Sequence, residues 1–391
     1  MADGRSYAPA PARVAGPYDP WVLRVSAALC ALVLVVRLVS PAEVPGLLDL
    51  RLLELFVVLI VAVECARRSA LFDLLVSGVL ARVRSERALA AAAVLTAGAT
   101  AAAVTNDVAL LLVVPFTLAF ERVAPEFDPA PIVVLEIAAA NLLGCLTPSG
   151  NPQNLFLFAR GGFTPSGFLA AQLPWVAAMA GALLLCVPVL VPRRPLPPAP
   201  AVVLRVRKRL ATAGVGLLVV QVLSILGVLP RYAPLLAAVP AAALLGRALL
   251  KTDFSLVAVF SFLFVVVEGL RRTPVFAQLD PIRHIGATPE AFVLSGALLS
   301  QGISNVPAAI LLAPSAAAAG GGALFTGLLY GVNAGGAGTP IASLANLIGA
   351  DLYVRGRPLH GRFWRLFLPV SFALLGAGVA VSLLLVRLRP A

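Results

Sequence analysis

Two short polar triplets interrupt apolar stretches of the chain, and their side chains suit ion binding. The first is Thr105-Asn106-Asp107 and the second is Ser304-Asn305-Val306. Hydroxyl and amide oxygens are ligands that small hard cations accept. A carboxylate within an apolar segment is costly and is usually kept for function. Asp107 is therefore our best candidate for a residue that couples a proton or a cation, although it could also be the N-cap of the following helix.

Each triplet is followed by a segment that glycines and prolines prevent from forming a regular helix, over residues 141–154 and 333–346. Such a break frees carbonyls for a cation and creates half-helix N-termini that can face an anion. The predicted ion and solute ligands are Thr105, Asn106, Asp107, Asn141, Thr147, Ser149, Gly150, Asn151, Asn154, Ser304, Asn305, Asn333, Gly336, Thr339 and Asn346. The alternative is that these polar side chains only join helices to one another.

Other carboxylates have weaker claims to function. Glu136 lies shortly before Asn141, and it is either a second titratable coupling group or a structural partner of a neighbouring asparagine. Glu64 and Glu268 each stand beside a pair of arginines near a predicted helix end. We expect these two to form structural ion pairs or to anchor the scaffold.

The two halves of the chain share this pattern. Residues 64–72 (ECARRSALF) match residues 268–276 (EGLRRTPVF), and the triplets follow in the same order. Further matches at one constant offset pair Asn141, Gly144, Thr147, Pro148, Asn154 and Leu155 with Asn333, Gly336, Thr339, Pro340, Asn346 and Leu347. The first matched helices are the second and the seventh predicted spans, so the copies cross in opposite directions. Inverted repeats with interrupted apolar segments are typical of secondary transporters.

The composition requires a membrane protein. Of 391 residues, 60% are apolar and 12% are charged, whereas a soluble domain is about a quarter charged. The sequence predicts an all-α polytopic protein with about nine full spans, two re-entrant hairpins and two broken helices. The hairpins are predicted at 89–121 and 289–319. The spans, of which the third and the eighth are the broken helices, are predicted at 21–40, 52–68, 131–159, 171–192, 210–229, 232–250, 254–272, 323–350 and 363–386.

The net charge of +12 does not point to nucleic acid, because the basic residues cluster between apolar runs as the positive-inside rule requires. Basic loops at 67–88, 193–209 and 351–365 fall on one side, which should be the cytoplasm. The N-terminus is then inside and the C-terminus outside. The predicted divisions are a polar segment 1–18, a first repeat 19–192, a cytoplasmic linker 193–209 and a second repeat 210–388.

At these residues the chain resembles the ion transporter superfamily, which includes divalent anion–sodium symporters, citrate permeases, arsenite permeases and sodium/proton antiporters. The resemblance covers about residues 50–386 and is most specific at Thr147–Leu155, Ser304–Pro307 and Gly331–Gly349. It implies a scaffold domain and an elevator-like transport domain in a bacterial inner membrane. It also implies two pseudo-symmetric ion sites with the solute between the hairpin tips, and it allows a homodimer. The triplets depart from the dicarboxylate symporters, because Asp107 and Val306 stand where those proteins carry a hydroxyl residue.

The leading hypothesis is a permease that moves a small anion or oxyanion-like solute by alternating access, coupled to Na⁺ or H⁺. The runner-up is a sodium/proton antiporter with Asp107 as the exchange site. A passive channel resembling aquaporins would have six full spans rather than nine. An intramembrane enzyme would need a buried nucleophile with its base, and both histidines, His284 and His360, lie in predicted loops. The sequence predicts no cofactor, no catalytic residue and no metal beyond a transported Na⁺.

Overall fold

The structure is a computed structural model that describes residues 20–80, 82–197, 205–225, 227–274, 286–355 and 361–388. The predicted polar segment 1–18 lies outside these residues, as do His284 and His360. Within them every regular element is a helix, apart from one isolated bridge between Ser85 and Pro195. The prediction of an all-α polytopic protein is confirmed.

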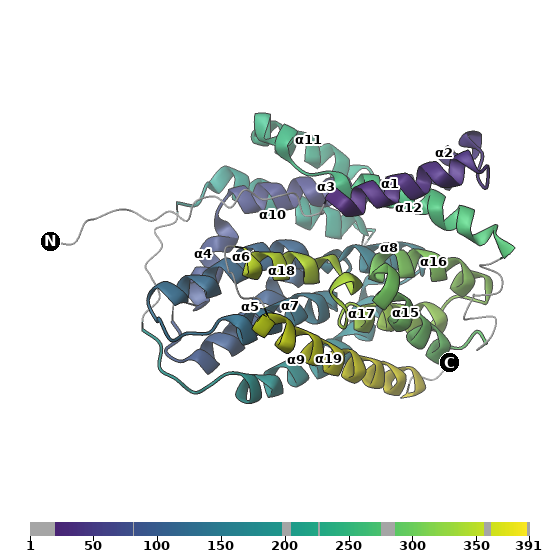
Figure 1. Cartoon of the computed structure of the whole chain (residues 1–391). Coiled ribbons are helices and arrows are strands. Elements are labelled where there is room, and N and C mark those ends of the chain that lie inside the picture. The colour runs from purple at the N-terminus through teal and green to yellow at the C-terminus, as the bar shows by residue number, and fades with distance from the viewer. Residues whose placement is uncertain are drawn as a thin grey trace.

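The helices form two layers, which Figure 1 shows one above the other. Contacts of α3 with α10 and α11, and of α1 with α12, join the first layer. Its helices are α1 (Pro20–Val35), α2 (Val44–Leu47), α3 (Leu50–Arg68), α10 (Lys208–Ile225), α11 (Ala233–Leu245) and α12 (Ser255–Arg271). The second layer holds α4 (Leu71–Leu80), α5 (Glu86–Ala103), α6 (Asn106–Ala119), α7 (Ala130–Leu143), α8 (Pro152–Arg160), α9 (Pro165–Leu190), α15 (Pro289–Ile303), α16 (Asn305–Ala318), α17 (Ala323–Gly335), α18 (Leu344–Val354) and α19 (Gly361–Leu388).

Helix starts follow local capping chemistry. In four helices the side chain of the N-cap residue accepts a hydrogen bond from a backbone N–H group of the first turn. These N-caps are Asp49 of α3, Ser85 of α5, Thr164 of α9 and Thr288 of α15. Each cap satisfies an N–H group that the helix itself cannot pair, which matters most where water is scarce.

Four helices of the described chain are long and apolar enough to cross a bilayer on their own: α9, α10, α19, and α11 with its 3₁₀ extension to Lys251. The arms of the predicted hairpins are shorter or less apolar. They are α5 and α6 in the first hairpin and α15 and α16 in the second, and each pair meets at a polar triplet. The predicted broken helices appear as α7 with α8 and as α17 with α18, joined by 3₁₀ turns at Gly144–Leu146, Pro148–Gly150 and Pro340–Ala342.

The loop predicted over 67–88 is wrong in part, because residues 71–80 form the helix α4. Its sequence, LFDLLVSGVL, is apolar enough to pack on α5 and α3. At ten residues it is far too short to span a membrane.

An aromatic and aliphatic core joins the two layers. Within the first layer, Phe56 of α3 contacts Phe260 of α12 with ring centroids 4.5 Å apart. Between the layers, the ring centroid of Phe156 of α8 lies 6.2 Å from that of Phe264 of α12. The same buried cluster includes Phe292 of α15. The layers therefore meet through apolar side chains around the site described below.

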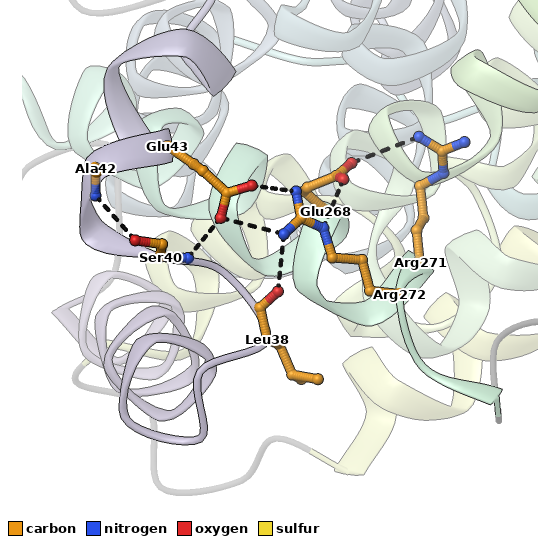
Figure 2. Close-up of polar contacts among 7 residues, drawn as sticks. All are labelled: Leu38, Ser40, Ala42, Glu43, Glu268, Arg271 and Arg272. Carbon is orange, nitrogen blue, oxygen red and sulfur yellow. Dashed lines mark hydrogen bonds and ion pairs between the residues drawn. The ribbon is translucent and has the colours of Figure 1, made fainter.

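A polar clasp fastens the end of α12 to the segment after α1 (Figure 2). The Arg272 guanidinium donates to both carboxylate oxygens of Glu43 at 2.9 and 3.2 Å, and to the Leu38 carbonyl at 3.1 Å. It also donates to Glu268 at 3.0 Å. Glu43 in turn accepts from the Ser40 backbone N–H at 2.7 Å. The predicted ion pairs of Glu64 and Glu268 with their neighbouring arginines are confirmed.

Arg272→Ala is expected to loosen this clasp, with severalfold faster hydrogen exchange of the backbone over residues 38–43. Arg271→Ala is the matched control, because among the described residues Arg271 pairs with Glu268 alone, at 3.6 Å. The hydrogen bond from Arg272 lowers the pKa of Glu43 below its ordinary 4.5. The contribution of this pair to stability is therefore complete above pH 4.5 and is lost as the pH falls through the lowered pKa. This account would be contradicted if Arg271→Ala and Arg272→Ala raised the exchange rate over residues 38–43 equally. It would also be contradicted if the effect of Arg272→Ala on that rate were undiminished at a pH below the lowered pKa of Glu43.

Candidate functional site

A cavity of about 380 Å³ lies between the two layers. The first layer supplies an apolar wall from α1, around Val25 and Leu29, and from α12, around Leu263 and Val267. The second layer supplies polar side chains that all lie at or beside helix starts, together with apolar residues such as Leu311 and the C-terminal end of α15 at Gly302 and Ile303. Four helices, α6, α8, α16 and α18, begin at the cavity. Four positive helix ends are thus directed at one small space.

The first triplet caps its own helix. The Thr105 hydroxyl accepts from the Val108 N–H at 3.4 Å, and the Asn106 side-chain oxygen accepts from the Asp107 N–H at 3.0 Å. Thr105, rather than Asp107, is therefore the N-cap of α6. The Asp107 carboxylate is left free of this structural duty, which removes the alternative explanation that the sequence left open.

Asp107 lines the cavity and is only 7% exposed. Its Oδ1 atom accepts no hydrogen bond from any described residue. No lysine, arginine or histidine is among the described residues that line the cavity, and Asp107 is the one carboxylate there. A buried carboxylate without a counter-charge is unstable as an anion, so the site favours a bound proton or cation.

The second triplet is built differently. Ser304 has φ 73°, in the left-handed region that non-glycine residues rarely adopt. Its hydroxyl donates to the Ala342 carbonyl at 3.3 Å and makes no cap on α16. Asn305 is 3% exposed and also lines the cavity.

Matched hydrogen bonds hold both broken segments to their hairpins. The Thr147 hydroxyl donates to the Ala102 carbonyl at 2.6 Å, and the Thr339 hydroxyl donates to the Gln301 carbonyl at 2.9 Å. The Asn154 amide donates to the Thr147 carbonyl at 3.3 Å, as the Asn346 amide does to the Thr339 carbonyl at 3.0 Å. These bonds satisfy carbonyls that the breaks leave unpaired. They occur at the positions that the internal sequence match had paired.

Asn141 connects the two halves. Its side-chain oxygen accepts from the Asn106 amide at 3.2 Å and from the Ser343 hydroxyl at 2.7 Å, and its amide donates to Asn346 Oδ1 at 2.8 Å. The matching Asn333 has no hydrogen-bond partner for either polar atom among the described residues. The network is therefore centred on the first copy and is not symmetric.

Glu136 is fully buried on α7, away from the cavity lining. One carboxyl oxygen is bonded to the Thr117 hydroxyl of α6, and the other has no described partner. Its neighbour is therefore a threonine, where the sequence had suggested an asparagine.

Of the predicted site residues, Asn106, Asp107, Ser304 and Asn305 line the cavity. The others do not line the cavity: Thr105, Glu136, Asn141, Thr147, Ser149, Gly150, Asn151, Asn154, Asn333, Gly336, Thr339 and Asn346. The backbone at Gly336 comes so close to the second tip that a Cβ there would lie 3.2 Å from the Asn305 amide nitrogen. The predicted set thus separates into a cavity lining and the framework that supports it.

Sequence reasoning missed several lining residues. Gln153 at the start of α8 borders the cavity. It lies within a broken segment, so the signal was available. Nothing in the sequence distinguishes the apolar wall residues Leu29 and Leu263 from the many other apolar helix residues.

Comparison with known proteins agrees with this architecture. The citrate transporter family profile matches residues 19–324. The chain is 31% identical over 355 residues to inner membrane protein YbiR of Escherichia coli K12, covering 89% of this chain and 91% of that protein. It is 29% identical over 355 residues to uncharacterized transporter MJ0456 of Methanocaldococcus jannaschii, covering 88% and 92%. With a match over most of its length, a multi-helical membrane architecture and a cavity at converging helix starts, this chain belongs to the citrate transporter family and is a transporter rather than an enzyme.

Proposed function

We propose that the chain is a secondary active transporter of the inner membrane that moves a small anion or oxyanion-like solute by alternating access, coupled to Na⁺ or H⁺. The observation that carries this proposal is the unpaired carboxylate of Asp107 in the cavity between the layers. The inner-membrane placement is supported by the printed name of the Escherichia coli relative.

Charge explains why transport would be coupled. Four helix N-termini attract an anion to the cavity, whereas the Asp107 carboxylate repels it. A proton or Na⁺ on Asp107 removes the repulsion, so the solute enters only with its coupling ion. The Asp107 carboxylate, one oxygen of which has no described hydrogen-bond partner, is the group to which that ion would bind.

The layers suggest how access alternates. We propose that the first layer is the scaffold and that the second, with both hairpins and both broken helices, is the moving domain. Among the described residues, the apolar wall from α1 and α12 makes no hydrogen bond to the triplets, so movement along this wall would leave the hydrogen bonds of the triplets intact. In this proposal the two halves are inverted repeats, with the N-terminus in the cytoplasm and the C-terminus outside.

A sodium/proton antiporter is the second candidate. It is favoured by the lack of a basic side chain in the described cavity lining, because an exchanger of cations needs only a carboxylate. Asp107 would then bind Na⁺ and H⁺ in turn, and no anion would move.

Charge movement in proteoliposomes separates the two candidates. We expect currents that require citrate, a dicarboxylate or arsenite and that depend on Na⁺ or on pH. Empty liposomes, and liposomes preloaded to abolish the ion gradient, are the controls. Proton counterflow driven by Na⁺ alone, with no response to any anion, would reject the permease in favour of the antiporter.

A further inference from the structure

The two halves of the cavity differ in how their helix starts are satisfied. In the first half, Thr105 caps α6 and Asn151 caps α8 by accepting from the Asn154 N–H at 3.1 Å. In the second half neither α16 nor α18 has a side-chain cap. The serines in the two N-cap positions, Ser304 and Ser343, donate their hydroxyls elsewhere.

The second half therefore has more backbone N–H groups without a described acceptor than the first half. The N–H groups of Asn305 and Val306 begin α16, and those of Leu344 and Ala345 begin α18; none donates to a described residue. In the first half only the Asn106 and Gln153 N–H groups have no described acceptor, because side chains accept from the Asp107, Val108 and Asn154 N–H groups. An unpaired N–H group in a membrane interior is costly unless a ligand or water accepts from it.

A buried side chain adds a second, independent donor to the same place. Asn305 is 3% exposed, and its amide nitrogen donates to no described residue. The nitrogen faces Gly336, which has no side chain, and a Cβ at that position would lie 3.2 Å away. An oxygen-bearing group in the cavity could accept from this amide and from the α16 N–H groups together.

From this asymmetry we propose a division of labour within the cavity: the second half binds the anionic group of the solute, a carboxylate or an oxyanion, and the first half binds the coupling cation. The proposal rests on the proposed function and refines it. The second half has no acidic residue at its tip, because Val306 stands where the first half has Asp107. The anion is held by backbone N–H groups and the Asn305 amide, which makes a basic side chain unnecessary.

The electrostatic difference can be measured without knowing the solute. Val306→Cys and Gln153→Cys place single thiols at the α16 and α8 starts, in a chain whose four native cysteines are replaced by serine. Each thiol is reacted with an anionic sulfonatoethyl and a cationic trimethylammonioethyl methanethiosulfonate. The ratio of the two rates cancels accessibility and reports local potential. We expect the anionic-to-cationic ratio to be about tenfold higher at Val306→Cys than at Gln153→Cys. The uncapped helix N-termini attract the anionic reagent to the first position, and the Asp107 carboxylate repels it from the second.

Adding Asp107→Asn to each single-cysteine variant tests whether the Asp107 carboxylate causes the difference between the two ratios. It should raise the ratio at Gln153→Cys strongly and change the ratio at Val306→Cys little, and citrate should protect Val306→Cys more than Gln153→Cys. Each variant is first shown to be monodisperse by gel filtration. Equal anionic-to-cationic ratios at the two positions, or a higher ratio at Gln153→Cys than at Val306→Cys, would overturn the inference. A chain that shows the expected ratios but moves no anion would refute the proposed function and leave the charge asymmetry standing.

Discussion

Asp107→Asn is expected to abolish coupled transport while leaving the fold intact. The variant keeps the shape of the side chain but removes the one carboxylate in the described cavity lining. A pH difference of one unit supports roughly tenfold accumulation for a one-proton symporter, since 1.4 kcal/mol corresponds to a factor of ten. Accumulation in proteoliposomes should therefore fall from about tenfold to none. Flux down a gradient of the solute itself is expected to be retained.

Asp351→Asn is the control for loss of a carboxylate. Asp351 is about half exposed at the end of α18, where it pairs with Arg355 outside the cavity lining. That variant should accumulate solute as the wild type does. If Asp107→Asn still accumulated solute against its gradient, the coupling role would be rejected. Glu136, buried and bonded to Thr117, would then be the next residue to test.

Gly150→Ala is expected to be the most damaging change in the framework. A Cβ on Gly150 would lie 1.9 Å from the Gly144 carbonyl oxygen, and that atom belongs to backbone rather than to a side chain that could rotate away. The two 3₁₀ turns of the first broken segment would have to separate. The cost should be about 3 kcal/mol or more, at the upper end of overpacking effects. We expect a clearly lower Tm in detergent and little folded protein in the membrane.

Gly181→Ala provides the matched control, because a Cβ at this position of α9 meets nothing within 4 Å. Alanine favours a helix over glycine by about 0.5–1 kcal/mol, so this variant should be neutral or slightly more stable. An unchanged Tm for Gly150→Ala would mean that the close approach of the two turns is not required for folding.

The sequence was most informative where glycine, proline and polar residues interrupt apolar runs. Both hairpins and both breaks were predicted to within a few residues, because these signals act locally through backbone geometry. The framework partner Gln301 lies just before the second triplet, but only the folded chain shows that its carbonyl accepts from Thr339.

The least predictable features depend on tertiary competition for hydrogen bonds. A serine before a helix start normally predicts an N-cap, yet Ser343 donates instead to Asn141, which lies in the other half of the chain. Ser304 likewise donates to the Ala342 carbonyl, in a conformation that its residue type does not suggest. The bare helix ends that support an anion site were therefore invisible in the sequence.

The paired bonds from Thr147 and Thr339 to the hairpin carbonyls have a consequence for how such a protein can diversify. They hold each break through residues outside the cavity lining, so these bonds do not involve the side chain at position 107 or 306. Asp107 and Val306 illustrate this freedom, since an acid and a hydrocarbon occupy corresponding places on equally well-held loops. Substitutions at these two positions would change the chemistry of the cavity and leave the hydrogen bonds that hold the two breaks in place.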